Sequence, residues 1–357
     1  MNTATDFSSS QAAPAQTAQQ QAFGLVLAFI QSQCVYTATK LGIFNLLQDE
    51  GEQGLGAIAQ KTSTQPERLY FILRALAHLD VLQEKPGQVF APTELSRLFI
   101  THQGPSIGHL ALHLLEPAQW DAWKALEGAL YTGEVPFERA NGQSVYQFCQ
   151  DNAWSGEVFI NAMSFLTDHA VDALLDVYDF SRFGNVMDVG GGQGGLIAQI
   201  VKRFGCQGML FEVPYVAETA PAYLAKQGVG PDSVQIITGD VFEKIPQGAD
   251  AIVMKYFISA WNDEDATKIL HNCKAALPPS GKIVLLQAFV PDLDEPKVAP
   301  DGVMPGIFAV QINVAVPGGG WRTRKQFQTL FENCGFQLER VVDTSTNLSA
   351  MEFGIAG

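Results

Sequence analysis

The sequence has few cysteines and few basic residues, and each scarcity excludes a class of protein. The five cysteines are odd in number and include no C-x-x-C pair; they stand at positions 34, 149, 206, 273 and 334. This pattern argues against a disulfide framework and favours buried free thiols in a reducing compartment. Only 22 residues are lysine or arginine against 37 acidic ones, for a formal net charge of −15. Because non-specific nucleic-acid binding depends on basic side chains that neutralise phosphates, we expect no nucleic-acid partner.

Long apolar runs are also scarce. No run approaches the roughly 20 residues of a membrane span, and the N-terminus lacks the basic segment and apolar core of a signal peptide. We therefore expect a cytosolic protein with no membrane partner. The 357 residues, 47% of them apolar, suffice for two domains and a substantial core.

The N-terminal part of the chain predicts a short disordered segment and a small helical domain. Residues 1–18 are rich in Gln, Ala, Ser and Thr and are predicted to be disordered. Residues 19–100 resemble a winged helix, with helices expected over 20–47, 55–59 and 66–79 and a hairpin over 81–90. DNA binding is the alternative for such a domain, but its candidate recognition helix carries only Arg68 and Arg74 as fixed positive charges. The stretch 23–30 is apolar nearly all round, so it must be buried, and a homodimer interface is the expected place.

Residues 101–180 predict a helical linker that is rich in aromatic side chains. Helices are expected over 94–100, 106–131, 143–150 and 153–178. The aromatic residues indicate either packing within a bundle or a pocket for a flat ligand. His109 and His113 are four residues apart, but Leu110 stands where a zinc-binding H-E-x-x-H motif needs Glu, so we expect no metal. His169 follows Asp168, and two interpretations of it remain open. It is either a residue at the surface or at a helix cap, or it lines the pocket as a hydrogen-bond donor or base.

From residue 181 to 357 strands and helices alternate, which predicts an α/β fold with a doubly wound, Rossmann-like, mostly parallel sheet. The expected strands are 186–189, 208–212, 234–237, 251–254 and 283–287, and the expected helices are 195–204, 215–227 and 263–277. Two antiparallel strands are expected between 335 and 355.

A glycine-rich turn between the first strand and the first helix of this region predicts a nucleotide-like cofactor. Gly190, Gly192 and Gly195 fit G-x-G-x-x-G, and the following helix start supplies free N–H groups. Glu212, about 20 residues on, can bind ribose hydroxyls. Ligands bind such sheets beyond the carboxyl ends of the strands, which adds Asp240 and the stretch from Lys255 to Trp261 to the expected cluster. This pattern is equally consistent with NAD and with S-adenosylmethionine as the cofactor.

Together these residues resemble the class I S-adenosylmethionine-dependent O-methyltransferases of the plant caffeate/isoflavone and bacterial polyketide type, over nearly the whole chain. Residues 38–44 look like that family's dimerisation helix. Residues 188–194, which begin with Asp188, are similar to the family's main cofactor motif. Phe211-Glu212-Val213-Pro214 is similar to the family's ribose-binding motif. Gly239-Asp240-Val241-Phe242 resembles the adenine-contacting motif. The resemblance implies that the cofactor is S-adenosylmethionine and that the substrate is a small aromatic or polyketide-like secondary metabolite.

The chain departs from the family at its catalytic positions. Ser259 stands where the family has a His base, and Gln287 and Trp321 stand where two glutamates orient it. Three hypotheses remain open: a methyltransferase whose acceptor needs no base or uses His169, a non-methylating enzyme that binds S-adenosylmethionine, and a non-catalytic binding protein. Substrate-lining residues are expected at four positions: Phe159, Met163, Phe308 and Asn313.

Overall fold

The computed structural model describes residues 17–300, 302–316 and 322–357, together with all side chains in these ranges except those of Asp168 and His169. The chain divides into two compact units after Arg97. The predicted disorder of residues 1–18 falls almost wholly outside the described residues. The boundaries predicted for a separate linker at 101–180 stay a prediction, because these residues lie within the second unit.

The first unit is a helical domain with a small three-stranded antiparallel sheet. Thr17 caps the first helix with a capping box, and Pro66 starts the fourth helix, where its missing N–H costs no hydrogen bond. The helices are α1 (Ala18–Lys40), α2 (Ile43–Glu50), α3 (Leu55–Lys61), α4 (Pro66–His78) and α5 (Glu94–Arg97), and the strands are β1 (Gln53–Gly54), β2 (Leu82–Lys85) and β3 (Val89–Pro92). Helices followed by the β2–β3 hairpin agree with the predicted winged-helix pattern.

The second unit is built around a seven-stranded sheet of order β6-β5-β4-β7-β8-β10-β9. Five strands are parallel, and β9 and β10 are antiparallel to their neighbours. The strands are β4 (Asn185–Val189), β5 (Gln207–Glu212), β6 (Val234–Thr238), β7 (Ala251–Lys255), β8 (Lys282–Gln287), β9 (Phe336–Asp343) and β10 (Ser349–Ile355). The chain runs outward from β4 to β6 and returns beside β4 with β7, so the strand order reverses there. The predicted fold class is confirmed.

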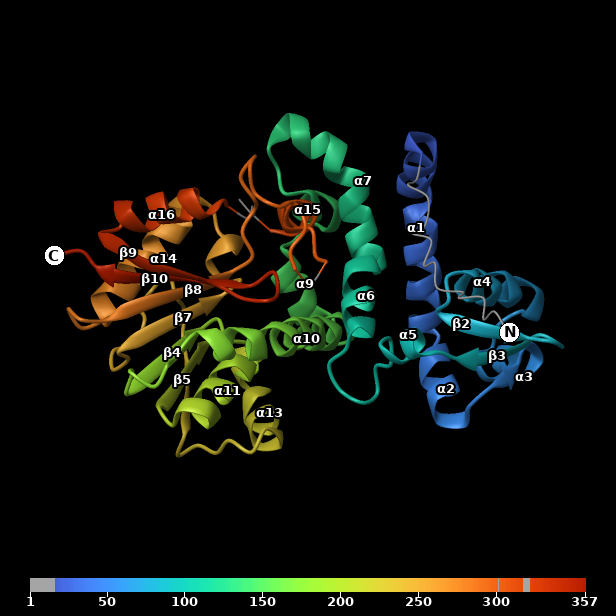
Figure 1. Ribbon diagram of the computed structural model, residues 1–357, viewed down its shortest axis with the longest axis horizontal. Coiled ribbons are helices and arrows are strands. Elements are labelled where there is room, and N and C mark those ends of the chain that lie inside the picture. The colour runs from blue at the N-terminus through green and yellow to red at the C-terminus, as the bar shows by residue number, and fades with distance from the viewer. Residues whose placement is uncertain (1–16, 301, 317–321) are drawn as a thin grey trace, which may run out of the picture. The chain divides into compact units, whose positions relative to one another are not determined.

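Helices cover both faces of this sheet because successive strand residues point to opposite sides. Val186 packs with α10 (Ala153–Val177), α11 (Gly195–Phe204) and α13 (Ala220–Lys226), whereas Met187 packs with α14 (Asp263–Ala276) and α16 (Arg324–Asn333). Figure 1 shows α14 and α16 on one side of the strands and α11 and α13 on the other. In β4, β7 and β8 nearly every residue is buried against one of these two cores, which explains the nearly continuous apolar runs of these strands.

Prolines break two helices that were predicted to be continuous. The stretch 106–131 forms α6 (Ile107–Leu115) and α7 (Pro117–Thr132), with Glu116 extended between them. The stretch 215–227 forms α12 (Pro214–Ala217) and α13, since Pro221 cannot donate a hydrogen bond to the preceding turn. Three helices and one short linker helix complete the unit: α8 (Pro136–Asn141), α9 (Val145–Asp151), α15 (Pro305–Ala315) and η1 (Ile258–Ala260). Of these, α8 and α15, like α16, were not predicted.

All five cysteines are free and buried, which confirms that prediction. Among the described residues, α1 and α10 are long and apolar enough to cross a membrane by length and composition alone. Core helices pass the same test, and Val171 and Leu174 of α10 are fully buried in the core beneath the sheet. The absence of a membrane span stays a prediction.

Candidate functional site

A cavity of about 690 Å³ lies at the carboxyl ends of β4, β5, β6 and β7, within the second unit. All nine residues predicted to bind the cofactor line it: Asp188, Gly190, Gly192, Glu212, Asp240, Val241, Phe242, Lys255 and Trp261. Its position matches the reversal in strand order between β4 and β7, where the loops diverge and leave room for a ligand.

The glycine-rich turn after β4 presents bare backbone to this cavity. Gly190 and Gly192 have positive φ angles of 68° and 60°, which glycine adopts without strain. A Cβ atom on Gly190 would lie 2.2 Å from the Phe257 ring, so this position also lacks room for a side chain. A Cβ atom on Gly192 would meet nothing within 4 Å, which leaves its backbone open to a ligand.

Glu212 ends β5 and is anchored to the glycine turn. Its Oε2 accepts a hydrogen bond from the Gly192 N–H at 3.0 Å, and its Oε1 accepts one from the Val213 N–H at 2.8 Å. Burial raises the pKa of Glu212, and these two hydrogen bonds oppose the shift. A carboxylate held in this way still has lone pairs for a pair of vicinal hydroxyls, as a ribose would offer.

Asp188 gives the clearest sign that a ligand completes the site. Its side chain is 1% exposed, and its Oδ2 has no hydrogen-bond partner. Burial raises its pKa to about 7, against the opposing effect of the Lys255 charge. A buried carboxylate oxygen without a donor is costly, so a ligand that brings a cationic N–H donor would be stabilised beside it. The ammonium group of an amino-acid moiety fits this requirement.

Aromatic side chains form a slot in the same cavity. Trp261 packs edge-on against Phe242 with ring centroids 4.8 Å apart, and it lies nearly parallel to Tyr146 at 6.5 Å. The Asp240 Oδ1 accepts a hydrogen bond from the Phe242 N–H at 2.8 Å, which fixes the loop after β6. Flat rings bind well between aromatic walls, and the buried Trp261 Nε1 has no partner of its own.

Of the residues predicted to line the substrate site, Phe159 and Met163 do so. Phe308 and Asn313 lie on α15, which packs against α7 and α8, and they are not among the described residues that line the cavity. The prediction placed them opposite the cofactor without recognising α15. Tyr256 and Phe257, which belong to the predicted stretch 255–261, also line the cavity. Tyr146 lines it too, although only the aromatic richness of residues 101–180 pointed to this residue.

Ser259 lies behind the cavity wall. It is 2% exposed, donates its hydroxyl to the Tyr256 carbonyl at 3.2 Å, and is not among the described lining residues. Gln287 is fully buried and donates to the Ala288 carbonyl at 3.1 Å. Trp321 lies outside the described residues. His169 belongs to α10, but its side chain is outside what the structure describes, so its role stays a prediction.

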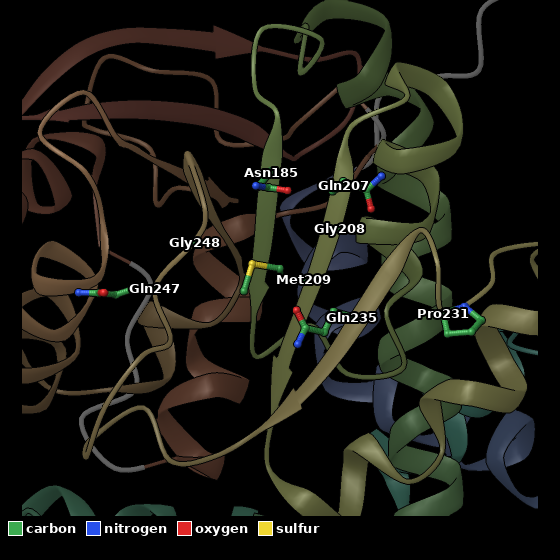
Figure 2. A pocket seen from close by; sticks show the side chains of 8 residues that line it. All are labelled: Asn185, Gln207, Gly208, Met209, Pro231, Gln235, Gln247 and Gly248. Carbon is green, nitrogen blue, oxygen red and sulfur yellow. The ribbon is translucent and has the colours of Figure 1, made fainter.

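A second hollow, of about 440 Å³, opens at the amino ends of the strands. Figure 2 shows its side chains, among them the amides of Asn185, Gln207, Gln235 and Gln247. None of its described lining residues is ionisable, and it lies at the edge of the sheet opposite the glycine turn. The features that could bind a charged nucleoside are all at the carboxyl edge.

Comparisons with known proteins agree with this geometry. Residues 123–337 match the model of an O-methyltransferase domain, and residues 23–102 match an O-methyltransferase dimerisation domain. The chain is 31% identical over 329 residues to a phenazine O-methyltransferase of Lysobacter antibioticus, covering 92% of this chain and 94% of that protein. It is 30% identical to a mitomycin biosynthesis 6-O-methyltransferase of Streptomyces lavendulae, with coverage of 87% and 86%.

Solved structures give the same result. The crystal structure of LaPhzM superposes with a TM-score of 0.89 at 29% identity, covering 95% of this chain and 100% of that chain. The mitomycin 7-O-methyltransferase MmcR superposes with a TM-score of 0.86 at 29% identity, covering 95% and 98%. The glycine turn, the anchored Glu212 and these matches together confirm the resemblance, and the chain belongs to the plant- and bacterial-type family of S-adenosylmethionine-dependent O-methyltransferases with an N-terminal dimerisation domain.

Proposed function

We propose that this protein transfers a methyl group from S-adenosylmethionine to a hydroxyl group of a flat, largely apolar aromatic or polyketide-like metabolite. The observation that carries the proposal is a single cavity that joins the anchored Glu212 and bare glycine turn to an apolar wall containing Phe159 and Met163. The phenazine and mitomycin methyltransferases that resemble this chain are consistent with an acceptor of this shape.

The cofactor end of the cavity has a partner for each part of the methyl donor. Glu212 would hold the ribose hydroxyls, and the buried oxygen of Asp188 would accept from the ammonium group. Asp240, Phe242 and Trp261 would hold the adenine by hydrogen bonding and ring contacts. When bound, the sulfonium supplies an electrophilic methyl group. The residues of the chain then contribute by fixing the approach of the acceptor, since positioning alone can accelerate a transfer greatly.

The acceptor end is apolar, with Phe159, Met163 and Tyr146 along its wall. The hydroxyl of Ser259 points to a backbone carbonyl, so we infer that it does not take the acceptor's proton. The reaction then needs either an acceptor that has lost its proton before it binds or a base elsewhere in the wall.

Methylation at nitrogen is a second candidate, and the serine at position 259 favours it, because a neutral amine needs no base before it attacks. The structure of a riboflavin-analogue N,N-dimethyltransferase from Streptomyces davawensis superposes with a TM-score of 0.80 at 26% identity, covering 96% of this chain and 100% of that chain. Matched hydroxy- and amino-substituted acceptors would decide between the two.

We also propose that the protein is a homodimer and works in the cytosol. The match to a dimerisation domain supports the dimer, as does the apolar face of α1, where Leu25 is 80% and Val26 69% exposed in the single chain. Five buried free thiols support a reducing compartment.

The test is incubation with cofactor labelled in its methyl group and a panel of hydroxylated phenazines, quinones and cinnamates, each with its amino analogue. Label in the product, with one cofactor consumed per product, supports methyl transfer. Product that requires the cofactor but leaves it intact would instead support a non-methylating enzyme. Cofactor binding without any turnover would support a binding protein. Glu212→Ala is the control, because it should abolish cofactor binding measured by calorimetry.

A further inference from the structure

The proposed methylation of a hydroxyl releases one proton, and the inference developed below rests on that proposed function. Among the described ionisable residues that line the cavity, Asp188, Glu212, Asp240 and Lys255 belong to the cofactor end. Tyr146 and Tyr215 are poor proton acceptors because burial raises the pKa of both phenols. Tyr256, which also lines the cavity, donates its hydroxyl to Oδ1 of Asn347 at 3.3 Å. The wall behind the lining residues therefore becomes the place to look for a base.

A buried histidine and a buried carboxylate face each other in that wall. His113, near the end of α6, is 6% exposed, and Glu116, in the extended junction before α7, is 3% exposed. The Nδ1 of His113 lies 3.8 Å from Oε1 of Glu116 and has no hydrogen-bond partner. The Ser155 hydroxyl of α10 donates to Oε2 of Glu116 at 2.8 Å and holds the carboxylate in place. A carboxylate beside an imidazole can orient the ring and stabilise the positive charge that the ring gains while it holds the acceptor's proton.

The Phe159 ring connects this pair to the cavity. Its centroid lies 5.1 Å from the centroid of the His113 ring and 6.3 Å from that of Tyr146, and both Phe159 and Tyr146 line the cavity. If the Phe159 side chain turns aside when a flat acceptor binds, the imidazole of His113 is opened to the edge of that acceptor. With Nδ1 directed at Glu116, Nε2 is the nitrogen left to accept a proton.

Gln119 is a second buried polar side chain close to the apolar cluster that includes Phe159. It is fully buried on α7, its Oε1 accepts a hydrogen bond from the Gln311 Nε2 at 3.0 Å, and its own Nε2 has no partner. Its helix neighbours Ala118 and Ala122 belong to the apolar cluster against which Phe159 packs. Buried donors without partners are rare in folded proteins, so two unsatisfied polar side chains near one apolar cluster suggest a bound polar group that satisfies them.

We propose that His113, oriented by Glu116, is the general base of the reaction. The O–H bond of the acceptor breaks and its proton passes to Nε2 of His113. A lone pair on the acceptor oxygen forms the new bond to the methyl carbon. At the same time the carbon–sulfur bond breaks, and its two electrons stay on sulfur as a lone pair. The imidazolium beside the Glu116 carboxylate then loses its proton to water after the product leaves. His113 thus replaces, from a different element, the base that is missing at Ser259.

The kinetic test compares acceptors of different acidity. A general base contributes about 10² to 10⁴ in rate, and only where the acceptor is still protonated. His113→Gln should therefore lower kcat/KM about 10²-fold for weakly acidic phenols, and less than about fivefold for nitrophenols that are already ionised at the assay pH. Glu116→Gln should give a smaller loss, of about tenfold, with the same selectivity. An equal loss for both kinds of acceptor, or no loss for either, would overturn the proposal.

His109→Gln is the matched control, because His109 lies one turn earlier on α6 and is also buried, but its Nδ1 bonds to the Ser106 hydroxyl at 3.1 Å. It should leave both rates within about twofold of the wild type. Thermal unfolding of each variant identifies any that fails to fold.

A second measurement needs no methyl transfer. With S-adenosylhomocysteine bound, absorbance reports the ionised fraction of a weakly acidic chromogenic nitrophenol in the site. The proposal predicts at least about threefold more bound phenolate at neutral pH in the wild type than in His113→Gln. Equal fractions, or no ionisation of any panel phenol by the wild type, would overturn it. If labelled methyl never moves but this difference is found, the proposed function fails while the assignment of His113 stands.

Discussion

At the scale of single residues, two buried side chains decide how the site can work. Ser259 was predicted to stand at the family's position for the base, and its hydroxyl is turned to the Tyr256 carbonyl. Burial leaves one oxygen of Asp188 unsatisfied and raises its pKa to about 7. Both observations lead to measurable predictions.

Ser259→Ala should change kcat/KM by less than about tenfold, because a hydroxyl that donates to a backbone carbonyl takes no proton from the acceptor. Loss of that hydrogen bond should cost about 1 kcal/mol of stability. Steady-state kinetics and thermal unfolding measure the two effects. A rate loss of about 10³-fold would show that Ser259 takes part in the chemistry.

Cofactor affinity should depend on the ionisation of Asp188. Burial raises its pKa to about 7, so the carboxyl is neutral below that pH and charged above it. An ammonium group is attracted only to the charged form. Affinity for S-adenosylhomocysteine should therefore fall as pH drops below 7, by at most about tenfold per pH unit for one proton. Calorimetry from pH 5.5 to 8.5 measures this, and Asp188→Asn should give weaker binding with a flatter profile. A wild-type profile as flat as that of the variant would contradict the assignment.

At the scale of elements, the end of α10 is tied to the antiparallel edge of the sheet by one buried carboxylate. Glu352 of β10 is 1% exposed and accepts hydrogen bonds from Tyr178, Arg182 and Arg340, with Tyr178 at 2.7 Å and Arg340 at 2.6 Å. Burial alone would raise the pKa of Glu352, but these hydrogen bonds outweigh it and hold the pKa below its ordinary value. Since α10 also supplies Phe159 and Met163, this link helps to hold one wall of the cavity.

Glu352→Gln should lower the free energy of unfolding by about 1 to 3 kcal/mol at pH 7, because it leaves two partly exposed arginines without their charge partner. A carboxylate with a lowered pKa stabilises the fold above its unfolded pKa, and that contribution is lost as pH falls through the folded value. The cost of the substitution should therefore shrink below about pH 4. Glu339→Gln, which removes the exposed ion pair with Lys282, is the control and should cost less than about 1 kcal/mol. Equal costs in urea unfolding would refute the prediction.

At the scale of the whole molecule, α1 exposes more apolar surface than a single chain keeps in water. Phe23, Leu25, Val26 and Phe29 are each more than half exposed, at 60%, 80%, 69% and 54%. Contiguous apolar surface of this kind is typical of an interface between protomers. The matched dimerisation domain includes these residues.

Leu25→Glu should convert the proposed homodimer to monomers, because a carboxylate buried in an apolar interface loses its hydration without gaining a partner. Sedimentation velocity measures the change. Gln60→Glu adds the same charge at an exposed position of α3 and should leave the dimer intact. A Leu25→Glu variant with unchanged mass in solution would place the interface elsewhere.

The sequence by itself determined the features that depend on neighbouring residues. Strand alternation, the glycine turn at Gly190 and the acidic residue at Glu212 are local signals, because positive φ and strand periodicity are set within a few residues. The five parallel strands were found nearly to their ends, and the cofactor end of the cavity followed from where those strands stop.

Only the tertiary structure decided what depends on contacts between distant segments. It placed Ser259 behind the wall and set His113 against Phe159, 46 positions along the chain. It also formed the unpredicted α15, whose Phe308 and Asn313 are not among the described lining residues of the cavity. Such pairs meet because helices pack through side chains whose neighbours no local pattern specifies. The proposed proton acceptor, His113, could therefore be found only in the packed protein.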